Sequence, residues 1–170
     1  SGRVIGQASH AGTTPTALRA DALCAVAELA LYLEQRARSD GDCVATMGQI
    51  AVPHGSVNVV PGECVFSLDI RAPNDLQRNQ IERDALQMLE QICQRRALRF
   101  ELEQTLRASA ATSDPHWQQA WESAVAQLGL PVQRLPSGAG HDAMQLHTLM
   151  PQAMLFVRGQ NVGISHNPLE

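Results

Sequence analysis

One of the six histidines has the sequence neighbourhood of a metal ligand. His166 lies in a polar segment, Gly-Ile-Ser-His-Asn-Pro at residues 163–168, shortly after the apolar run at residues 154–157. The run is short, unbroken and β-prone, which is typical of a strand buried on both faces of a parallel sheet. Ligands bind beyond the carboxyl ends of such strands. His166 is therefore either a metal ligand or a loop histidine hydrogen-bonded to the backbone. Because a catalytic zinc needs about three protein ligands, His166 alone does not make a metal site.

A second group of candidate residues could bind a carboxylate. Arg71 lies on the polar face of a predicted strand, where its guanidinium suits bidentate capture of a carboxylate. Asn58 stands just before the turn on the adjoining strand and could supply an amide to the same carboxylate. The alternative for Arg71 is a solvated side chain or an ion pair with Asp69 or Glu63. The alternative for Asn58 is an ordinary asparagine beside a turn.

The glycine-rich segment at residues 137–142 holds a further candidate. His141 follows two glycines, the second of them Gly140, and glycines let backbone amides approach a ligand closely. The alternative for His141 is a structural role in which it pairs with Asp142.

The candidate residues belong to two parts of the chain whose predicted secondary structures differ. Strands are predicted at residues 4–9, 44–52, 58–60, 63–71 and 100–103, with a helix after Thr14 and another that begins with an Asn74 capping box. The order is β-α-β-β-α-β, the ferredoxin-like split unit, in which both helices cover one face of an antiparallel sheet. We therefore expect an α+β fold with a first domain at residues 1–107.

Residues 108–170 have a different pattern. A helix carries Trp117 and Trp121 on one face, and the glycine-rich segment, the apolar run and the His166 segment follow it. One helix and one buried strand are too little for a domain. We therefore expect this part to be a piece of a larger α/β domain with a parallel sheet.

Composition narrows the class of protein. The net charge of −4 does not favour binding to nucleic acid or to an anionic membrane. The four cysteines are far apart and form no Cys-x-x-Cys, which indicates free buried thiols. We expect a cytoplasmic protein without a membrane segment.

Five ordered segments carry a family resemblance. They are Ser-His-Ala-Gly-Thr-Thr-Pro (9–15), Val-Asn-Val-Val-Pro-Gly (57–62), Leu-Asp-Ile-Arg (68–71), Ser-Gly-Ala-Gly-His-Asp-Ala-Met (137–144) and Gly-Ile-Ser-His-Asn-Pro (163–168). Together they resemble the dinuclear-metal amidohydrolases that include allantoate amidohydrolase, N-carbamoyl-L-amino-acid hydrolase and β-ureidopropionase. The resemblance covers essentially the whole chain, and it implies that residues 1–107 are the lid domain and residues 108–170 the C-terminal part of the metal-dependent catalytic domain.

The resemblance implies a role for each candidate. His10 corresponds to a histidine of the inserted lid domain that stabilises the tetrahedral oxyanion; without the motif it would be read as structural. Gly140 and His141 correspond to substrate-contacting residues, as do Asn58 and Arg71. His166 corresponds to the last ligand of two divalent ions, zinc or manganese.

The family also implies the reaction and the partners. A metal-bound water, deprotonated by a carboxylate outside this chain, attacks the ureido or amide carbonyl of a small carboxylate substrate, and the lid forms a homodimer. Because most metal ligands would lie outside the 170 residues, we expect the chain alone to be inactive and to bind no metal tightly. The alternative is a stand-alone ferredoxin-like module for dimerisation or for binding a small ligand.

Overall fold

The computed structural model describes residues 1–157 and residue 159. The described chain forms two compact units, and each is considered by itself. The first unit comprises Ser1–Ala110 and Pro136–Gly138, and the second comprises Ala111–Leu135 and the chain from Ala139 onward. The combination of helices and sheets confirms the mixed class that the sequence predicts.

The first helix of the first unit, α1 (Ala22–Arg38), begins later than predicted. Its cap is Asp21, whose side chain accepts a hydrogen bond from the Cys24 N–H at 3.1 Å. The segment after Thr14 instead forms a short 3-10 helix, η1 (Thr16–Leu18), which has no side-chain cap. The prediction of a helix starting at Thr14 was therefore wrong, because Asp21 caps α1 and its carboxylate satisfies one of the free N–H groups in the first turn.

The second helix, α2 (Asp75–Arg95), confirms the predicted cap. The Asn74 side chain accepts a hydrogen bond from the Gln77 N–H at 2.9 Å and donates one to the Gln77 side chain at 2.6 Å. Helices α1 and α2 then turn apolar stripes at helical spacing toward the same core. The buried members of these stripes are Ala22, Ala25, Val26, Leu29, Leu33, Ala37, Ile81, Ala85, Leu89, Ile92 and Cys93.

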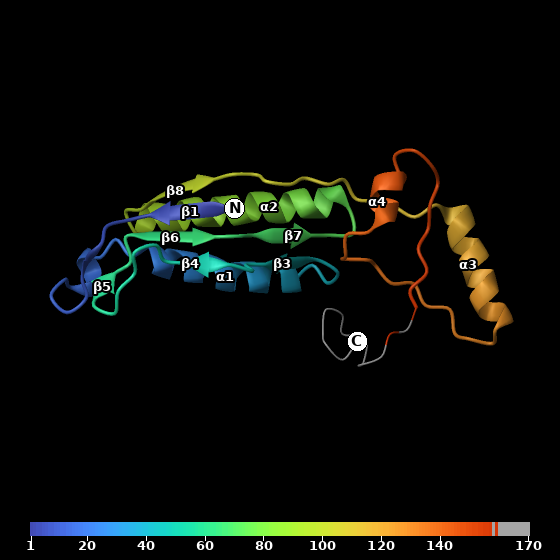
Figure 1. Ribbon diagram of the computed structural model, residues 1–170, viewed down its shortest axis with the longest axis horizontal. Coiled ribbons are helices and arrows are strands. Elements are labelled where there is room, and N and C mark those ends of the chain that lie inside the picture. The colour runs from blue at the N-terminus through green and yellow to red at the C-terminus, as the bar shows by residue number, and fades with distance from the viewer. Residues whose placement is uncertain (158, 160–170) are drawn as a thin grey trace. The chain divides into compact units, whose positions relative to one another are not determined.

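The helices cover one face of a four-stranded antiparallel sheet (Figure 1). Its strand order is β4-β6-β1-β8. Alternation along the strands separates the two faces: Val4 is buried opposite Cys64, whereas Arg3 is paired with Glu101 on the other face at 2.7 Å. The four strands are β1 (Gly2–Ile5), β4 (Ile50–Ala51), β6 (Glu63–Phe66) and β8 (Arg99–Leu102).

Each of the three long predicted strands is divided in two. One piece of each divided strand joins the four-stranded sheet. The other pieces, β2, β3 and β7, form two separate ladders: β2 pairs with β5, and β3 pairs with β7. At the first division the Gly6 N–H donates to the Gly62 carbonyl at 2.8 Å, so backbone bonding continues across the break. These four elements are β2 (Ser9–His10), β3 (Val44–Thr46), β5 (Val59–Val60) and β7 (Asp69–Arg71).

The cysteines are free, as the sequence indicates, but they are not all buried. Cys43, Cys64 and Cys93 are buried, and burial raises the pKa of each thiol. Cys24 is exposed on α1, which corrects the expectation for that residue. No helix among the described residues is long and apolar enough to cross a membrane.

The second unit contains two helices, α3 (Pro115–Gln127) and α4 (Asp142–Leu146). Asp114 caps α3 by accepting hydrogen bonds from the N–H groups of His116 and Trp117 at 3.0 and 3.2 Å. The proline at the first helical position needs no hydrogen-bond partner for an N–H, so it suits the start of the helix.

The buried strand expected at residues 154–157 is absent. This segment has no regular structure, and Leu155, Phe156 and Val157 are 45%, 52% and 86% exposed. A strand needs a neighbour that satisfies its N–H and C=O groups, and the described part of the second unit contains no other strand. The prediction was therefore wrong for this structure. His166 lies outside the described residues.

Candidate functional site

Two of the predicted site residues, His10 and Asn58, lie together at one end of the first unit. The short strands β2 and β5 pair antiparallel, with His10 opposite Val59. The Ala11 N–H then donates to the Asn58 carbonyl at 2.9 Å, which extends the ladder by one bond. We call residues 9–19 together with residues 56–60 the tip (Figure 1).

The local backbone fixes the imidazole of His10. The Gly12 N–H donates a hydrogen bond to His10 Nδ1 at 3.0 Å. A neutral imidazole that accepts at Nδ1 carries its proton at Nε2. Because the side chain is exposed at the tip, His10 presents an N–H donor that can bind a negatively charged oxygen. Gly12 also leaves room for the ring, since a Cβ there would lie 3.2 Å from His10 Cε1.

Arg19 forms hydrogen bonds with two backbone carbonyls of the loop that follows His10. Its Nη2 donates to the Ala11 carbonyl at 2.6 Å, and its Nε donates to the Thr14 carbonyl at 3.0 Å. The Thr14 N–H in turn donates to the His10 carbonyl at 3.1 Å. Sequence reasoning missed Arg19, because it lies in an irregular segment where no periodic pattern distinguishes it.

The side chain of Asn58 has an N–H₂ group that can bind a ligand. Its Oδ1 accepts a hydrogen bond from the Ser56 hydroxyl at 3.0 Å. Within the described part of the chain Nδ2 makes no hydrogen bond, and the residue is exposed. The amide can therefore donate to a carboxylate at the tip.

Arg71 makes the ion pair that the sequence left open. Its Nε and Nη2 donate to the two carboxylate oxygens of Asp69 at 2.9 and 2.7 Å, and Nη1 donates to the Gly138 carbonyl at 2.7 Å. These hydrogen bonds lower the pKa of Asp69 and raise that of Arg71. Glu63, the other suggested partner, instead lies 3.6 Å from Arg3. One proton on each Nη of Arg71 is left for a further acceptor.

Arg71 does not lie with Asn58. Strand β7 continues the line of β6 end to end. The label of β5 lies near the start of β6, and β7 lies beyond its end (Figure 1). Nine extended residues from Glu63 to Arg71 span roughly 25–30 Å at about 3.3 Å per residue. The expectation that both residues hold the same carboxylate is therefore wrong within one chain.

The other two described candidates, Gly140 and His141, belong to the second unit. His141 is the residue before α4, and its Nδ1 is buried without a hydrogen-bond partner among the described residues. The alternative role of His141, a pair with Asp142, is therefore not made through Nδ1 among the described residues. A Cβ at Gly140 would meet nothing within 4 Å, so open space surrounds this position.

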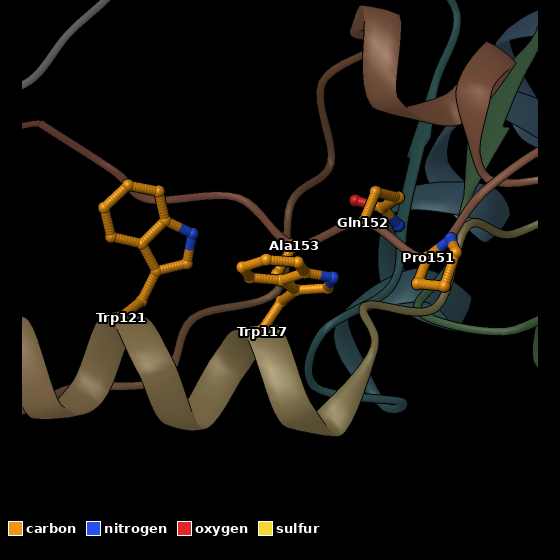
Figure 2. Close-up of a pocket in the computed structure, with 5 residues that line it drawn as sticks. All are labelled: Trp117, Trp121, Pro151, Gln152 and Ala153. Carbon is orange, nitrogen blue, oxygen red and sulfur yellow. The ribbon is translucent and has the colours of Figure 1, made fainter.

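The second unit also has a small hollow of about 230 Å³ beside α3 (Figure 2). The rings of Trp117 and Trp121 project from the helix toward residues 151–153. The Gln152 carbonyl accepts a hydrogen bond from the Asp114 N–H at 2.7 Å, which holds the two segments together. None of the predicted site residues that the structure describes lines this hollow.

The described residues do not assemble a metal centre by themselves. Across residues 1–157 and 159, no three histidine, cysteine, aspartate or glutamate side chains are grouped as ligands. The predicted ligand His166 lies outside this part of the chain.

Comparison with known proteins places these features in context. The family model described as peptidase family M20/M25/M40 matches residues 9–170. An N-carbamoyl-L-amino acid amidohydrolase of Geobacillus stearothermophilus is 38% identical over 167 residues, covering 98% of this chain and 41% of the relative. An allantoate deiminase of Arabidopsis thaliana is 34% identical over 194 residues, covering 98% of this chain and 37% of the relative.

A solved structure of a related amidase also resembles this chain. A hydantoinase/carbamoylase family amidase from Burkholderia ambifaria superposes with a TM-score of 0.84 and 33% identity, over 90% of this chain and 38% of the neighbour. The chain thus spans about two fifths of the length of the curated relatives that it matches.

Proposed function

The chain belongs to peptidase family M20/M25/M40, and we propose that it is part of an amidohydrolase that cleaves the ureido or N-carbamoyl C–N bond of a small carboxylate substrate. The names of the relatives support this substrate class, since N-carbamoyl-L-amino acids and allantoate each combine a ureido group with a carboxylate. The observation that carries the proposal is the hydrogen bond from the Gly12 N–H to Nδ1 of the exposed His10, because a neutral imidazole that accepts at Nδ1 carries its proton at Nε2.

The chemistry assigned to His10 is oxyanion stabilisation. When the oxygen of water adds to the ureido carbonyl carbon, the carbonyl oxygen gains a negative charge. The Nε2–H of His10 donates to that oxygen, and the donor bond strengthens as the charge develops. The intermediate then collapses, the C–N bond breaks, and the leaving nitrogen takes up the proton that the attacking water has lost.

We propose that the whole protein is metal-dependent and that His166 is one ligand of two divalent ions, zinc or manganese. Such ions supply an acidified water to a hydrolase. Support comes from the family, whose amidohydrolases are generally dinuclear metal enzymes. The described residues do not form such a centre, and we expect the 170-residue chain alone to hydrolyse neither substrate.

Substrate binding is assigned to residues of both units, each considered by itself. In the first unit Arg71 binds the carboxylate through the Nη protons that its bonds to Asp69 and Gly138 do not use. In the second unit Gly140 and His141 are assigned as substrate-binding residues. Asn58 donates its amide from the tip beside His10. Because β5 of the tip lies before the start of β6, and β7, which carries Arg71, lies beyond its end (Figure 1), we propose that the tip and Arg71 serve the active sites of two different subunits.

This arrangement requires a homodimer. We propose that the first unit is a ferredoxin-like lid through which two subunits associate around a two-fold axis. The strand order β4-β6-β1-β8 with two helices on one face supports the ferredoxin-like assignment. The edge strands β4 and β8 offer unpaired backbone groups to a partner.

A second candidate function is a stand-alone dimerisation or small-ligand-binding module. It is favoured by one observation, namely that the first unit buries a core drawn entirely from its own residues. The cores of catalytic lids and of independent modules do not differ in this respect, so activity must decide.

The test is hydrolysis by the whole protein. We expect turnover of an N-carbamoyl-L-amino acid or of allantoate, loss of that turnover on chelation, and no cleavage of a dipeptide with the same side chain. A protein that binds these carboxylates without turnover, in the presence of zinc or manganese, would instead favour the binding module.

A further inference from the structure

A single peptide group connects the guanidinium of Arg19 with the imidazole of His10. The carbonyl oxygen of the Ala11–Gly12 peptide accepts the hydrogen bond from Arg19 Nη2 at 2.6 Å. The N–H of the same peptide donates to His10 Nδ1 at 3.0 Å. Because the peptide is planar and rigid, the position of its carbonyl determines the direction of its N–H.

This chain of hydrogen bonds has an electrostatic consequence. A carbonyl that accepts from a cation forms a stronger hydrogen bond than one that accepts from a neutral donor. Hydrogen bonds in series also polarise each other, by about 10–30% per bond. Arg19 therefore makes the Gly12 N–H a better donor, and a better donor favours the imidazole form in which Nδ1 accepts and Nε2 carries the proton.

The position of Arg19 is itself well determined. The Ala20 carbonyl, next in the chain, accepts from the Gln7 N–H at 3.0 Å, and the Ala22 N–H donates to the Pro61 carbonyl at 3.0 Å. A Cβ at Gly6 would lie 2.0 Å from the Ala20 oxygen, so the backbones of the two segments are in close contact. The chain that follows Arg19 is thereby fixed to Gln7, which precedes β2, and to Pro61, which follows β5.

We propose that Arg19 is a positioning residue, which holds His10 as the Nε2–H tautomer and orients the ring through the Ala11–Gly12 peptide. Arg19 does not touch the substrate in this account. The inference rests on the proposed role of His10 as the oxyanion donor, and it adds the group that prepares His10 for that role.

The first test is ¹⁵N NMR of the imidazoles in this chain at about pH 9, where histidine is normally neutral. The His10 signals are assigned by their loss in His10→Gln. We expect the Nε2–H tautomer in the wild type and a mixture of tautomers in Arg19→Gln. Arg38→Gln, which removes an exposed pair with Glu34 on α1, is the matched control and leaves the signals unchanged.

A second variant covers the case in which Arg19→Gln does not fold. In Arg19→Lys the ammonium reaches one of the two carbonyls but not both, so we expect an intermediate tautomer ratio and a retained fold by circular dichroism. A folded Arg19→Gln or Arg19→Lys protein with wild-type His10 signals would overturn the proposal.

Kinetics of the whole protein separate this inference from the proposed function. We expect His10→Ala to lower kcat about 100- to 1000-fold, and Arg19→Gln to lower it about tenfold with KM changed less than about twofold, as for a group that acts through another. In the His10→Ala background, Arg19→Gln then has no further effect.

The outcomes are distinguishable. Unchanged kcat in His10→Ala would refute the catalytic role of His10, whereas the NMR result would still decide whether Arg19 sets its tautomer. An equal loss from Arg19→Gln with and without His10 would refute positioning through His10.

Discussion

The two units differ in how completely they bury their side chains. Every fully buried apolar residue of the described chain lies between Val4 and Leu98, in the first unit. In the described part of the second unit no residue is buried, and Leu149 is 82% exposed. The first unit is therefore stabilised by its own core, whereas the second unit derives little stability from burial.

This difference extends to the candidate site residues. His10 and Asn58 are held by ladder bonds and by loop bonds that involve Gly12 and Arg19. His141 and Gly140 precede a five-residue helix, and open space surrounds Gly140. The first unit thus positions its functional groups through hydrogen bonds of its own fold. In the described part of the second unit, fewer contacts hold the candidate residues.

A matched pair of leucine truncations should give the largest contrast. Leu29, which is 1% exposed in α1, should lose about 2–5 kcal/mol of unfolding free energy on substitution by alanine. Leu149→Ala should change it by less than about 0.5 kcal/mol. Urea denaturation followed by far-ultraviolet circular dichroism measures both. Equal losses would show that the second unit has a core of comparable quality.

The two units should also unfold at different urea concentrations. Both tryptophans, Trp117 and Trp121, lie in the second unit, so their fluorescence reports on that unit, whereas most of the helical signal comes from α1 and α2. We expect the fluorescence midpoint about 1 M or more below the circular dichroism midpoint, a difference of about 1–3 kcal/mol. Coincident transitions would indicate one cooperative unit and contradict the comparison.

Substitution of Arg71 tests the group at the far end from the tip. In the whole protein Arg71→Lys keeps the charge but loses the planar fork, and we expect carboxylate substrates to bind more weakly by about 1–3 kcal/mol. The measurement compares a carboxylate substrate with its neutral amide analogue. If both substrates lose equally, Arg71 is not the carboxylate-binding residue.

The smallest expected effect is the pH dependence of the pair between Asp69 and Arg71. Because Arg71 lowers the pKa of folded Asp69, the pair stabilises the protein above the unfolded pKa of about 3.9. This contribution is lost as the pH falls through the lower folded pKa. Both side chains are about half exposed, so it should be below about 1 kcal/mol. The wild type and Asp69→Asn, compared in urea at pH 7 and pH 3, measure it; an unchanged difference would contradict it.

Local patterns in the sequence predicted much of the first unit. Alternation and helical spacing located the sheet and α2, and the Asn74 cap was correct because its partner Gln77 is only three residues away. The predictions failed where distant residues decide. The Thr14 cap was wrong because Asp21 starts α1, and Asn58 was grouped with Arg71 because a sequence does not show how far a strand run separates its ends.

The sequence was least informative for the second unit and for Arg19. A short apolar run such as residues 154–157 forms a strand only beside another strand, and the described unit supplies none. Arg19 acts through two backbone carbonyls, and backbone contacts of this kind leave no residue pattern. Motif resemblance identified His10, and the structure adds how Gly12 and Arg19 hold it.

If the tip and Arg71 serve the active sites of different subunits, two inactive variants should restore activity when they are mixed. Whole protein carrying His10→Ala is unfolded and refolded together with protein carrying Arg71→Ala. In a mixed dimer one site then receives an intact His10 from one subunit and an intact Arg71 from the other. With random pairing we predict recovery of about a quarter of wild-type activity. Mixed dimers as inactive as either variant alone would contradict the account and place both residues in one subunit's site.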